Sequence, residues 1–237
     1  GTLASIDTRK TTLLLTLLCA AVNLAWVLAV RIEPFSDYET YWQTACALAS
    51  GGEIDAPWYI AMYPHILGCS TFLSAFLKIF GEHVMVAAVI NVILTCLSGL
   101  LIYSICLRLA SPLTAALAYL LWIVCPSKMM LNPLVFSEPL YTCLILLFFY
   151  LIVLIEQQRG SLPRRLGVCL LWGLALGVLL RAVNIVRPIS AILIIALVLW
   201  LLFLRGHDIK DGAQWKMWLV ILVALLGIYK ATGELWD

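Results

Sequence analysis

Residues Val84–Leu107, VMVAAVINVILTCLSGLLIYSICL, form an uninterrupted apolar stretch without a charged side chain. A helix needs about 20 such residues to cross the hydrocarbon core of a bilayer. Thr11–Val30 is a second stretch of this kind. It is too long for a removed signal peptide and lacks a small-residue cleavage site before the next polar stretch. Both stretches therefore predict membrane-spanning helices.

The overall composition agrees with a membrane protein and excludes other classes. Of the 237 residues, 64% are hydrophobic and 12% charged, against roughly 45–50% and 25% in an ordinary soluble domain. The net charge of +2 offers no basic excess for a nucleic-acid backbone, so no nucleic-acid partner is expected. We expect an all-α membrane protein of about seven transmembrane helices. The five further spans are the shorter apolar runs Ala110–Cys125, Pro139–Ile155, Leu166–Leu180, Ile189–Leu204 and Met217–Tyr229.

The run Ile66–Phe80 decides the topology, because it has only 15 residues, follows Pro64 and carries Lys78 near its end. If it does not cross, nine of the 15 basic residues share one side, as the positive-inside rule favours. These are Arg9, Lys10, Arg108, Arg159, Arg164, Arg165, Arg205, Lys210 and Lys216. We therefore expect Ile66–Phe80 to be an interfacial or re-entrant helix on the outer face. The N-terminus is then inside and the C-terminus outside.

Six of the eight cysteines lie inside apolar runs and are interpreted as small buried hydrophobic residues. They are Cys19, Cys96, Cys106, Cys125, Cys143 and Cys169. Only Cys46 and Cys69 fall in a region that could face an oxidising compartment. Their spacing alone does not establish a disulfide.

The first outer loop, about residues 31–83, collects most of the outer acidic residues and is expected to carry the active site. Its opening is PFSDYETYW, residues 34–42. Ser36 is the expected helix N-cap, and Glu39 three residues later would complete a capping box. We expect a helix over Asp37–Ala49 that lies at the membrane interface and ends at the glycine pair 51–52.

Asp37 and Glu39 are the candidate catalytic residues of this loop. One interpretation is that both are merely acids favoured at a helix start by the helix dipole. The other is functional, because an unpaired charge over a membrane surface is expensive and a carboxylate beside apolar walls suits a general base. Their spacing cannot place both on one helical face. We assign the chemical role to Asp37, since Glu39 has the capping duty available.

Several features follow one another in a characteristic order. An acidic motif follows the first span, then an interfacial helix, then Tyr63-Pro64-His65 opening a run that ends at Lys78-Ile79-Phe80-Gly81. A span holding Asn91 and ending in Arg108 comes next. This order of features resembles the GT-C superfamily of membrane glycosyltransferases. Within the superfamily the chain looks most like protein mannosyltransferases and the aminoarabinose transferase of lipid A, and the resemblance covers about residues 11–205.

The resemblance implies an inverting glycosyltransferase that uses a polyprenyl-phosphate sugar donor, with Asp37 as catalytic base. The family often has adjacent acids, whereas this chain has Asp-x-Glu. Membrane lipids and a glycan, lipid or protein acceptor are the other expected partners. The expected location is a bacterial cell membrane, with the active site facing outside. Family members are usually longer, so residues 1–237 are expected to form a single transmembrane module that is either minimal or truncated at its C-terminus.

Charged residues near other span ends are candidates for the donor phosphate. Two arginines at a span mouth, Arg181 and Arg187, either anchor to lipid headgroups or bind the carrier phosphate, for which guanidinium is suited. The resemblance implies an arginine in this region at that phosphate, and Arg187 is favoured because Pro188 fixes its backbone. Lys128 of the second outer loop, residues 127–137, is a further candidate.

Glu138, at the mouth of the fourth span, is interpreted either as a helix-start acid or as a carboxylate supporting Asp37. Stabilisation of the leaving phosphate then comes from the basic residues or from a divalent cation, magnesium or manganese, held by Asp37 and Glu138. His65 is more simply a hydrogen-bonded structural residue than a metal ligand. No zinc-hydrolase, dithiol or nucleotide-binding motif occurs in the chain.

Two other functional classes compete with the glycosyltransferase. A secondary transporter or flippase predicts charged residues at mid-bilayer depth, and the expected spans have ionisable residues only at their ends. A non-catalytic assembly subunit predicts that loss of Asp37 is harmless. Neither accounts for seven acids on the outer face. These acids are Glu33, Asp37, Glu39, Glu53, Asp55, Glu82 and Glu138.

Overall fold

The structure, a computed structural model, describes residues 7–55, 57–158, 160, 165–204 and 212–233. Regular secondary structure within these residues is entirely helical, which confirms the all-α class. The chain divides into two compact units, Gly1–Leu147 and Phe148–Asp237. Each unit is described by itself.

Five described helices are long and apolar enough to cross a membrane. They are α1 (Thr8–Ala29), α5 (Val84–Leu109), α8 (Glu138–Gln158), α9 (Leu166–Val186) and α11 (Gly212–Gly233). Each coincides with one of the seven expected spans. The chain is therefore a multi-pass membrane protein.

The third and sixth expected spans form shorter helices, so the count of seven is not confirmed. Helix α6 (Pro112–Ile123) has 12 residues, about 18 Å at 1.5 Å per residue. It ends before Pro126, because the proline ring excludes helical backbone at Cys125, which has φ −70° and ψ 107°. Helix α10 (Ser190–Leu199) passes into a π-helical segment, Trp200–Leu204.

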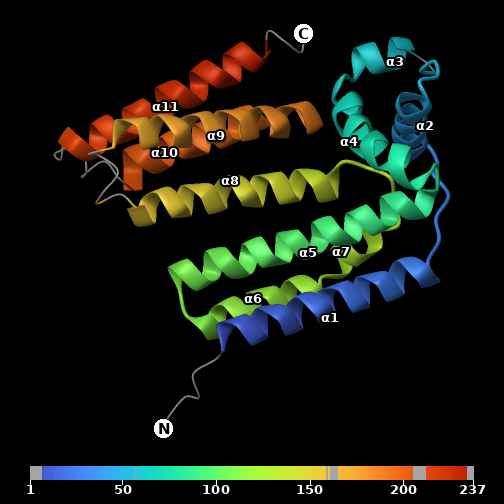
Figure 1. Cartoon of the computed structure of the whole chain (residues 1–237), viewed down its shortest axis with the longest axis horizontal. Coiled ribbons are helices and arrows are strands. Elements are labelled where there is room, and N and C mark those ends of the chain that lie inside the picture. Colours follow the sequence, from blue (N-terminus) through green and yellow to red (C-terminus); the bar gives the residue numbers. More distant parts are fainter. Residues whose placement is uncertain (1–6, 56, 159, 161–164, 205–211, 234–237) are drawn as a thin grey trace. The chain divides into compact units, whose positions relative to one another are not determined.

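The core of the first unit lies between α1, α5 and α6, which run side by side (Figure 1). Gly99 lets α5 and α6 approach closely, since a Cβ atom there would overlap the Tyr119 ring. The Tyr119 hydroxyl donates to the Cys96 carbonyl at 3.2 Å. A short helix, α7 (Pro126–Leu131), follows α6.

A second group of helices in this unit comes from the first expected loop (Figure 1). Helix α2 (Asp37–Ser50) packs on α4 (His65–Phe80), with the short α3 (Pro57–Met62) between them in sequence. Gly51 ends α2 with φ 75°, as expected from its freedom to adopt left-handed backbone. The helices expected over Asp37–Ala49 and Ile66–Phe80 are therefore confirmed. Their interfacial location stays a prediction.

In the second unit, α9 packs tightly against α11 (Figure 1). The contact uses Gly173 and Gly177, where an added Cβ would lie 2.6 Å from the Ile221 and Leu225 carbonyl oxygens respectively. Small residues four apart allow such close approach in membranes. Some basic residues used for orientation lie outside the described residues, namely Arg159, Arg164, Arg205 and Lys210.

No disulfide joins Cys46 and Cys69 in the described structure. Cys46 lies on α2 and Cys69 on α4. Burial, followed by the Glu82 charge, raises the pKa of the Cys46 thiol to about 11. This thiol is protonated at neutral pH and is a poor nucleophile.

Candidate functional site

Asp37 follows a tight turn that leads from α1 into α2. The Tyr38 amide donates to the Phe35 carbonyl across this turn at 3.1 Å. Ser36 has φ 52° and ψ −130°, near the first central position of a type II′ turn, which favours glycine. Among the described residues other than glycine, Ser36 alone has positive φ. Strained backbone of this kind is enriched at functional sites. The strained turn therefore supports a functional role for the adjacent Asp37.

Asp37 lines a cavity of about 360 Å³, within the usual size range of ligand pockets. The cavity wall comprises Ser36, Asp37, Thr40, Gln43, Thr44, Asp55, Trp58 and Tyr59. The Tyr59 hydroxyl donates to Asp37 Oδ1 at 3.4 Å. Burial and the nearby Asp37 charge raise the pKa of Tyr59, so this hydroxyl remains a donor at neutral pH. The site combines a carboxylate, hydroxyl and amide groups with two exposed or half-buried aromatic rings.

Glu39 does not line the Asp37 cavity itself but bonds Gln43, which does. Its carboxylate accepts a hydrogen bond from Gln43 Nε2 at 2.9 Å, one turn along α2. The expected capping box is wrong, because the Ser36 side chain makes no capping hydrogen bond. A capping serine needs extended backbone, and the positive φ of Ser36 departs from it.

The segment after α7 is held by a network of buried polar side chains. Asn132 Nδ2 donates to Asn23 Oδ1 at 2.7 Å, and Asn132 Oδ1 accepts from the Thr95 hydroxyl at 2.9 Å. Asn91 Nδ2 donates to the carbonyls of Asn132 and Leu134 at 3.1 and 2.8 Å. The four polar side chains of the network are at most 6% exposed. The network joins α1, α5 and the segment that leads into α8.

Glu138 is the first residue of α8 and is half-buried. Phe136, two residues earlier, packs edge-on against Tyr38, with ring centroids 5.7 Å apart. The structure thus brings the segment before Glu138 to the turn that presents Asp37. Lys128 lies on α7 with its Nζ atom 5.5 Å from the centroid of the Trp122 ring, a cation–π arrangement.

His65 begins α4, and a row of aromatic rings connects it to the cavity. Its ring lies edge-on to Tyr63 at 6.2 Å, and Tyr63 packs on Tyr59 at 4.8 Å. Within the described part of the chain, no three His, Cys, Asp or Glu side chains are grouped so as to hold a metal ion. The metal roles suggested for His65, Asp37 and Glu138 stay predictions.

Arg181 and Arg187 lie near the C-terminal end of α9, in the second unit. Arg181 Nη2 donates to the Gly233 carbonyl at 3.3 Å, which ties α9 to the end of α11. Arg187 follows α9 with extended backbone, φ −151° and ψ 127°, as a residue before proline prefers. Arg181 therefore has a structural contact within its unit. The phosphate-binding roles of both arginines stay predictions.

Comparison with known families identifies the class of protein. The sequence profile described as dolichyl-phosphate-mannose-protein mannosyltransferase matches residues 65–230, which is most of the chain. The chain belongs to this family. The resemblance to GT-C glycosyltransferases is thereby confirmed. No curated protein and no solved structure matches the chain.

Membership of the dolichyl-phosphate-mannose-protein mannosyltransferase family makes the chain a membrane glycosyltransferase. The matched segment includes five of the candidate residues, His65, Lys128, Glu138, Arg181 and Arg187. Asp37 and Glu39 precede it. The catalytic assignment of Asp37 therefore depends on the local geometry and on the resemblance of the first loop.

Sequence reasoning missed most of the residues that surround Asp37. Tyr59, Trp58 and Thr40 line the same cavity, yet they lie up to 22 positions away. The signal that could have singled out Tyr59 is its place in the aromatic pair Trp58-Tyr59, which follows the acid Asp55 by three and four residues.

Proposed function

We propose that this mannosyltransferase-family chain transfers a sugar from a polyprenyl-phosphate donor to an acceptor hydroxyl, with inversion at the anomeric carbon. The observation that carries the proposal is the Asp37 carboxylate at the wall of a cavity, held by the Tyr59 hydroxyl. The reaction takes place at the outer face of a bacterial cell membrane. This sidedness follows from the positive-inside distribution of the basic residues.

Asp37 acts as the general base in this mechanism. It accepts the proton of the acceptor hydroxyl while the hydroxyl oxygen attacks the sugar C1 from the face opposite the phosphate. The bond between C1 and the phosphate oxygen breaks, and the phosphate leaves with the electron pair. Tyr59 orients the carboxylate before attack, and such positioning by fixed neighbours is a major source of rate enhancement.

The cavity wall suits a sugar hydroxyl as acceptor or a sugar ring of the donor. Thr40, Thr44 and Gln43 supply hydroxyl and amide groups, which donate and accept hydrogen bonds. Trp58 is 66% exposed and offers an apolar ring with a polar N–H. This mixture matches the alternating apolar faces and hydroxyl edges of a pyranose.

Negative charge develops on the leaving phosphate and must be stabilised by positive side chains. Arg187 is the proposed main source of this positive charge, with Arg181 and Lys128 as further contributors. Arg187 presents a planar fork that can bond two phosphate oxygens at once. The role of Arg187 in binding the phosphate is tested by measuring the donor affinity of Arg187→Ala and of Arg187→Lys. The alanine variant should bind the donor more weakly than the lysine variant, because lysine keeps the charge. Equal loss in both would contradict phosphate binding.

The central experiment compares Asp37→Asn with Glu39→Gln in the purified full chain, using a polyprenyl-phosphate sugar and product detection. Asparagine keeps an oxygen that can accept from Tyr59 but cannot take a proton. We expect the Asp37→Asn rate to fall about 10²–10⁴-fold, the usual range for a general base, with donor binding retained. Glu39→Gln is the matched control, since its partner Gln43 can bond a glutamine equally well.

The same pair of variants tests the assignment within the loop. A rate for Asp37→Asn within about threefold of the parent would remove Asp37 from the mechanism, because general-base loss costs far more. An inactive Glu39→Gln beside an active Asp37→Asn would transfer the base function to Glu39.

A further inference from the structure

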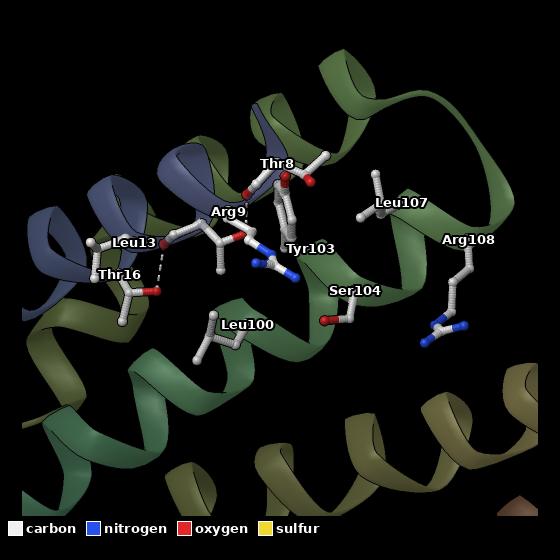
Figure 2. Close-up of a pocket in the computed structure, with 10 residues that line it drawn as sticks. Thr8, Arg9, Leu13, Thr16, Leu100, Tyr103, Ser104, Leu107 and Arg108 are labelled. Atoms are coloured by element: carbon white, nitrogen blue, oxygen red, sulfur yellow. Dashed lines mark hydrogen bonds between the residues drawn. The ribbon is translucent and has the colours of Figure 1, made fainter. Parts of the chain in front are cut away.

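Polar side chains also gather away from Asp37, in each of the two units. In the first unit they line a cavity of about 700 Å³ between the first turns of α1 and the last turns of α5 (Figure 2). The Tyr103 hydroxyl in the wall of this cavity is buried, so it is not accessible to a ligand. In the second unit the polar side chains bond one another on both sides of the turn that contains Arg187.

Arg187 and Pro188 form a tight turn between α9 and α10. The Arg187 amide donates to the Val183 carbonyl at 2.8 Å, and the Ile189 amide donates to the Arg187 carbonyl at 2.8 Å. The second bond closes a γ-turn with Pro188 at its centre. Since proline fixes its own φ and restricts the residue before it, the backbone of Arg187 has little freedom within the turn.

Three side chains from three helices are joined beside this turn. Asn184 lies in the last turn of α9, Ser190 is the first residue of α10, and Tyr229 lies on α11. The Ser190 hydroxyl donates to Asn184 Oδ1 at 2.7 Å, and its oxygen lies 2.8 Å from the Tyr229 hydroxyl oxygen. A serine hydroxyl has one proton. Because Ser190 gives that proton to Asn184, the Tyr229 hydroxyl is the donor in the second bond.

This chain of hydrogen bonds, from Tyr229 through Ser190 to Asn184, closes the segment of residues 184–190 around Arg187. Ser190 is only 1% exposed, and a buried hydroxyl is costly to leave without a partner. The start of α10 is therefore held against the end of α9, and α11 is tied to both. The γ-turn fixes the local backbone of Arg187, and the chain fixes the place of that turn among the three helices.

We propose, on the basis of the phosphate-binding role proposed for Arg187, that Asn184, Ser190 and Tyr229 are positioning residues for this arginine. They hold the turn so that the Arg187 guanidinium meets the donor phosphate in the correct orientation, and they act without contacting the donor. A guanidinium bonds two phosphate oxygens at once only when its planar fork is aligned with them. Loss of the chain should therefore weaken phosphate binding through Arg187.

The test measures the affinity of the purified full chain for polyprenyl phosphate, which carries the phosphate of the donor without its sugar. Tyr229→Phe removes the hydroxyl and keeps the ring. We expect its dissociation constant to rise about three- to tenfold, a part of what loss of bonds to a charged group costs. Ser190→Ala breaks both bonds of the chain, so it should weaken binding more than Tyr229→Phe and no more than Arg187→Ala.

A double-mutant cycle with Arg187→Ala separates positioning from a general structural effect. In the Arg187→Ala background, Tyr229→Phe should change the affinity by less than about twofold, because the residue that it positions is already lost. The matched control is Thr232→Val, which removes a hydroxyl from the same helix three residues further on. That hydroxyl bonds only carbonyls of its own helix, so the affinity of this variant should stay within about twofold of the parent.

The outcomes distinguish this positioning role from the proposed function. A Tyr229→Phe affinity equal to that of the parent, beside weaker binding by Arg187→Ala, would overturn the positioning role and leave the phosphate role of Arg187 intact. Equal weakening by Tyr229→Phe in the parent and in Arg187→Ala would show a general structural effect and would also overturn it. Unchanged binding by Arg187→Ala would remove the phosphate role of Arg187 and the positioning role together. Should Ser190→Ala fail to fold, the near-isosteric Tyr229→Phe still decides between these outcomes.

Discussion

Replacing Asn132 by alanine should destabilise the first unit more than any single exposed polar substitution. Its side chain is fully buried and bonds two helices at once, through Asn23 on α1 and Thr95 on α5. Alanine removes both hydrogen bonds. It also leaves a buried oxygen of Asn23 and a buried hydroxyl of Thr95 without these partners.

The magnitude follows from the number and surroundings of these bonds. Side-chain hydrogen bonds inside membrane proteins contribute about 0.6 kcal/mol on average and up to about 1.7 kcal/mol. Two bonds, together with the cost of unpaired buried groups, give a loss of about 1–3 kcal/mol in the free energy of unfolding. The direct Asn23–Asn132 interaction, at 2.7 Å, should account for about 0.6–1.7 kcal/mol of this loss.

A double-mutant cycle of Asn132→Ala and Asn23→Ala measures that interaction, with unfolding followed by detergent-induced loss of helical circular dichroism. Thr232→Val provides the control pair, because the Thr232 hydroxyl bonds carbonyls of its own helix. Its effect should add to that of Asn132→Ala. A coupling energy below about 0.3 kcal/mol for the asparagine pair, the usual limit of additivity, would refute the network.

Three further predictions concern backbone strain, helix packing and thiol reactivity. Ser36→Gly should raise the free energy of unfolding by about 1 kcal/mol by relieving the positive φ, whereas alanine there should not, and denaturant titration distinguishes the two. Gly177→Ala should destabilise the α9–α11 contact by about 1–3 kcal/mol through overpacking, while Gly167→Ala, with open space around it, should be neutral or stabilising in the same assay. Alkylation of Cys46, followed by mass spectrometry, should accelerate about tenfold per pH unit between pH 8 and 10, because its pKa of about 11 keeps the thiolate scarce. Glu82→Gln should shift that profile to lower pH, and an unchanged profile would contradict the contribution of the Glu82 charge.

The helices that depend on local signals could be predicted from the sequence. Val84–Leu107 and Thr11–Val30 are long apolar runs without charges, and both became membrane-length helices. The end of α2 was predictable because Gly51 accepts left-handed backbone at no steric cost. In each case the residues that determine the extent of the helix lie in that helix or directly beside it in the sequence.

Features that depend on distant residues could not be predicted. The hydrogen bond between Asn23 and Asn132 joins residues 109 positions apart. The sequence around either asparagine does not indicate which residue it bonds. The capping box failed for a related reason. Ser36 adopts a turn conformation in the connection after α1 that its own propensity disfavours, and Glu39 then bonds Gln43 instead.

The buried amides and the proposed catalytic loop are connected through a short segment. Asn91 fixes the carbonyls of Asn132 and Leu134, and Phe136, two residues further, packs against Tyr38 beside Asp37. A loop site needs such support, because a displacement of about 1 Å at a catalytic group can cost 10²-fold in rate. Disruption of the network should therefore lower the transfer rate even though no network side chain lines the Asp37 cavity. We therefore expect the buried asparagines of this glycosyltransferase to act as positioning residues for Asp37, the proposed base.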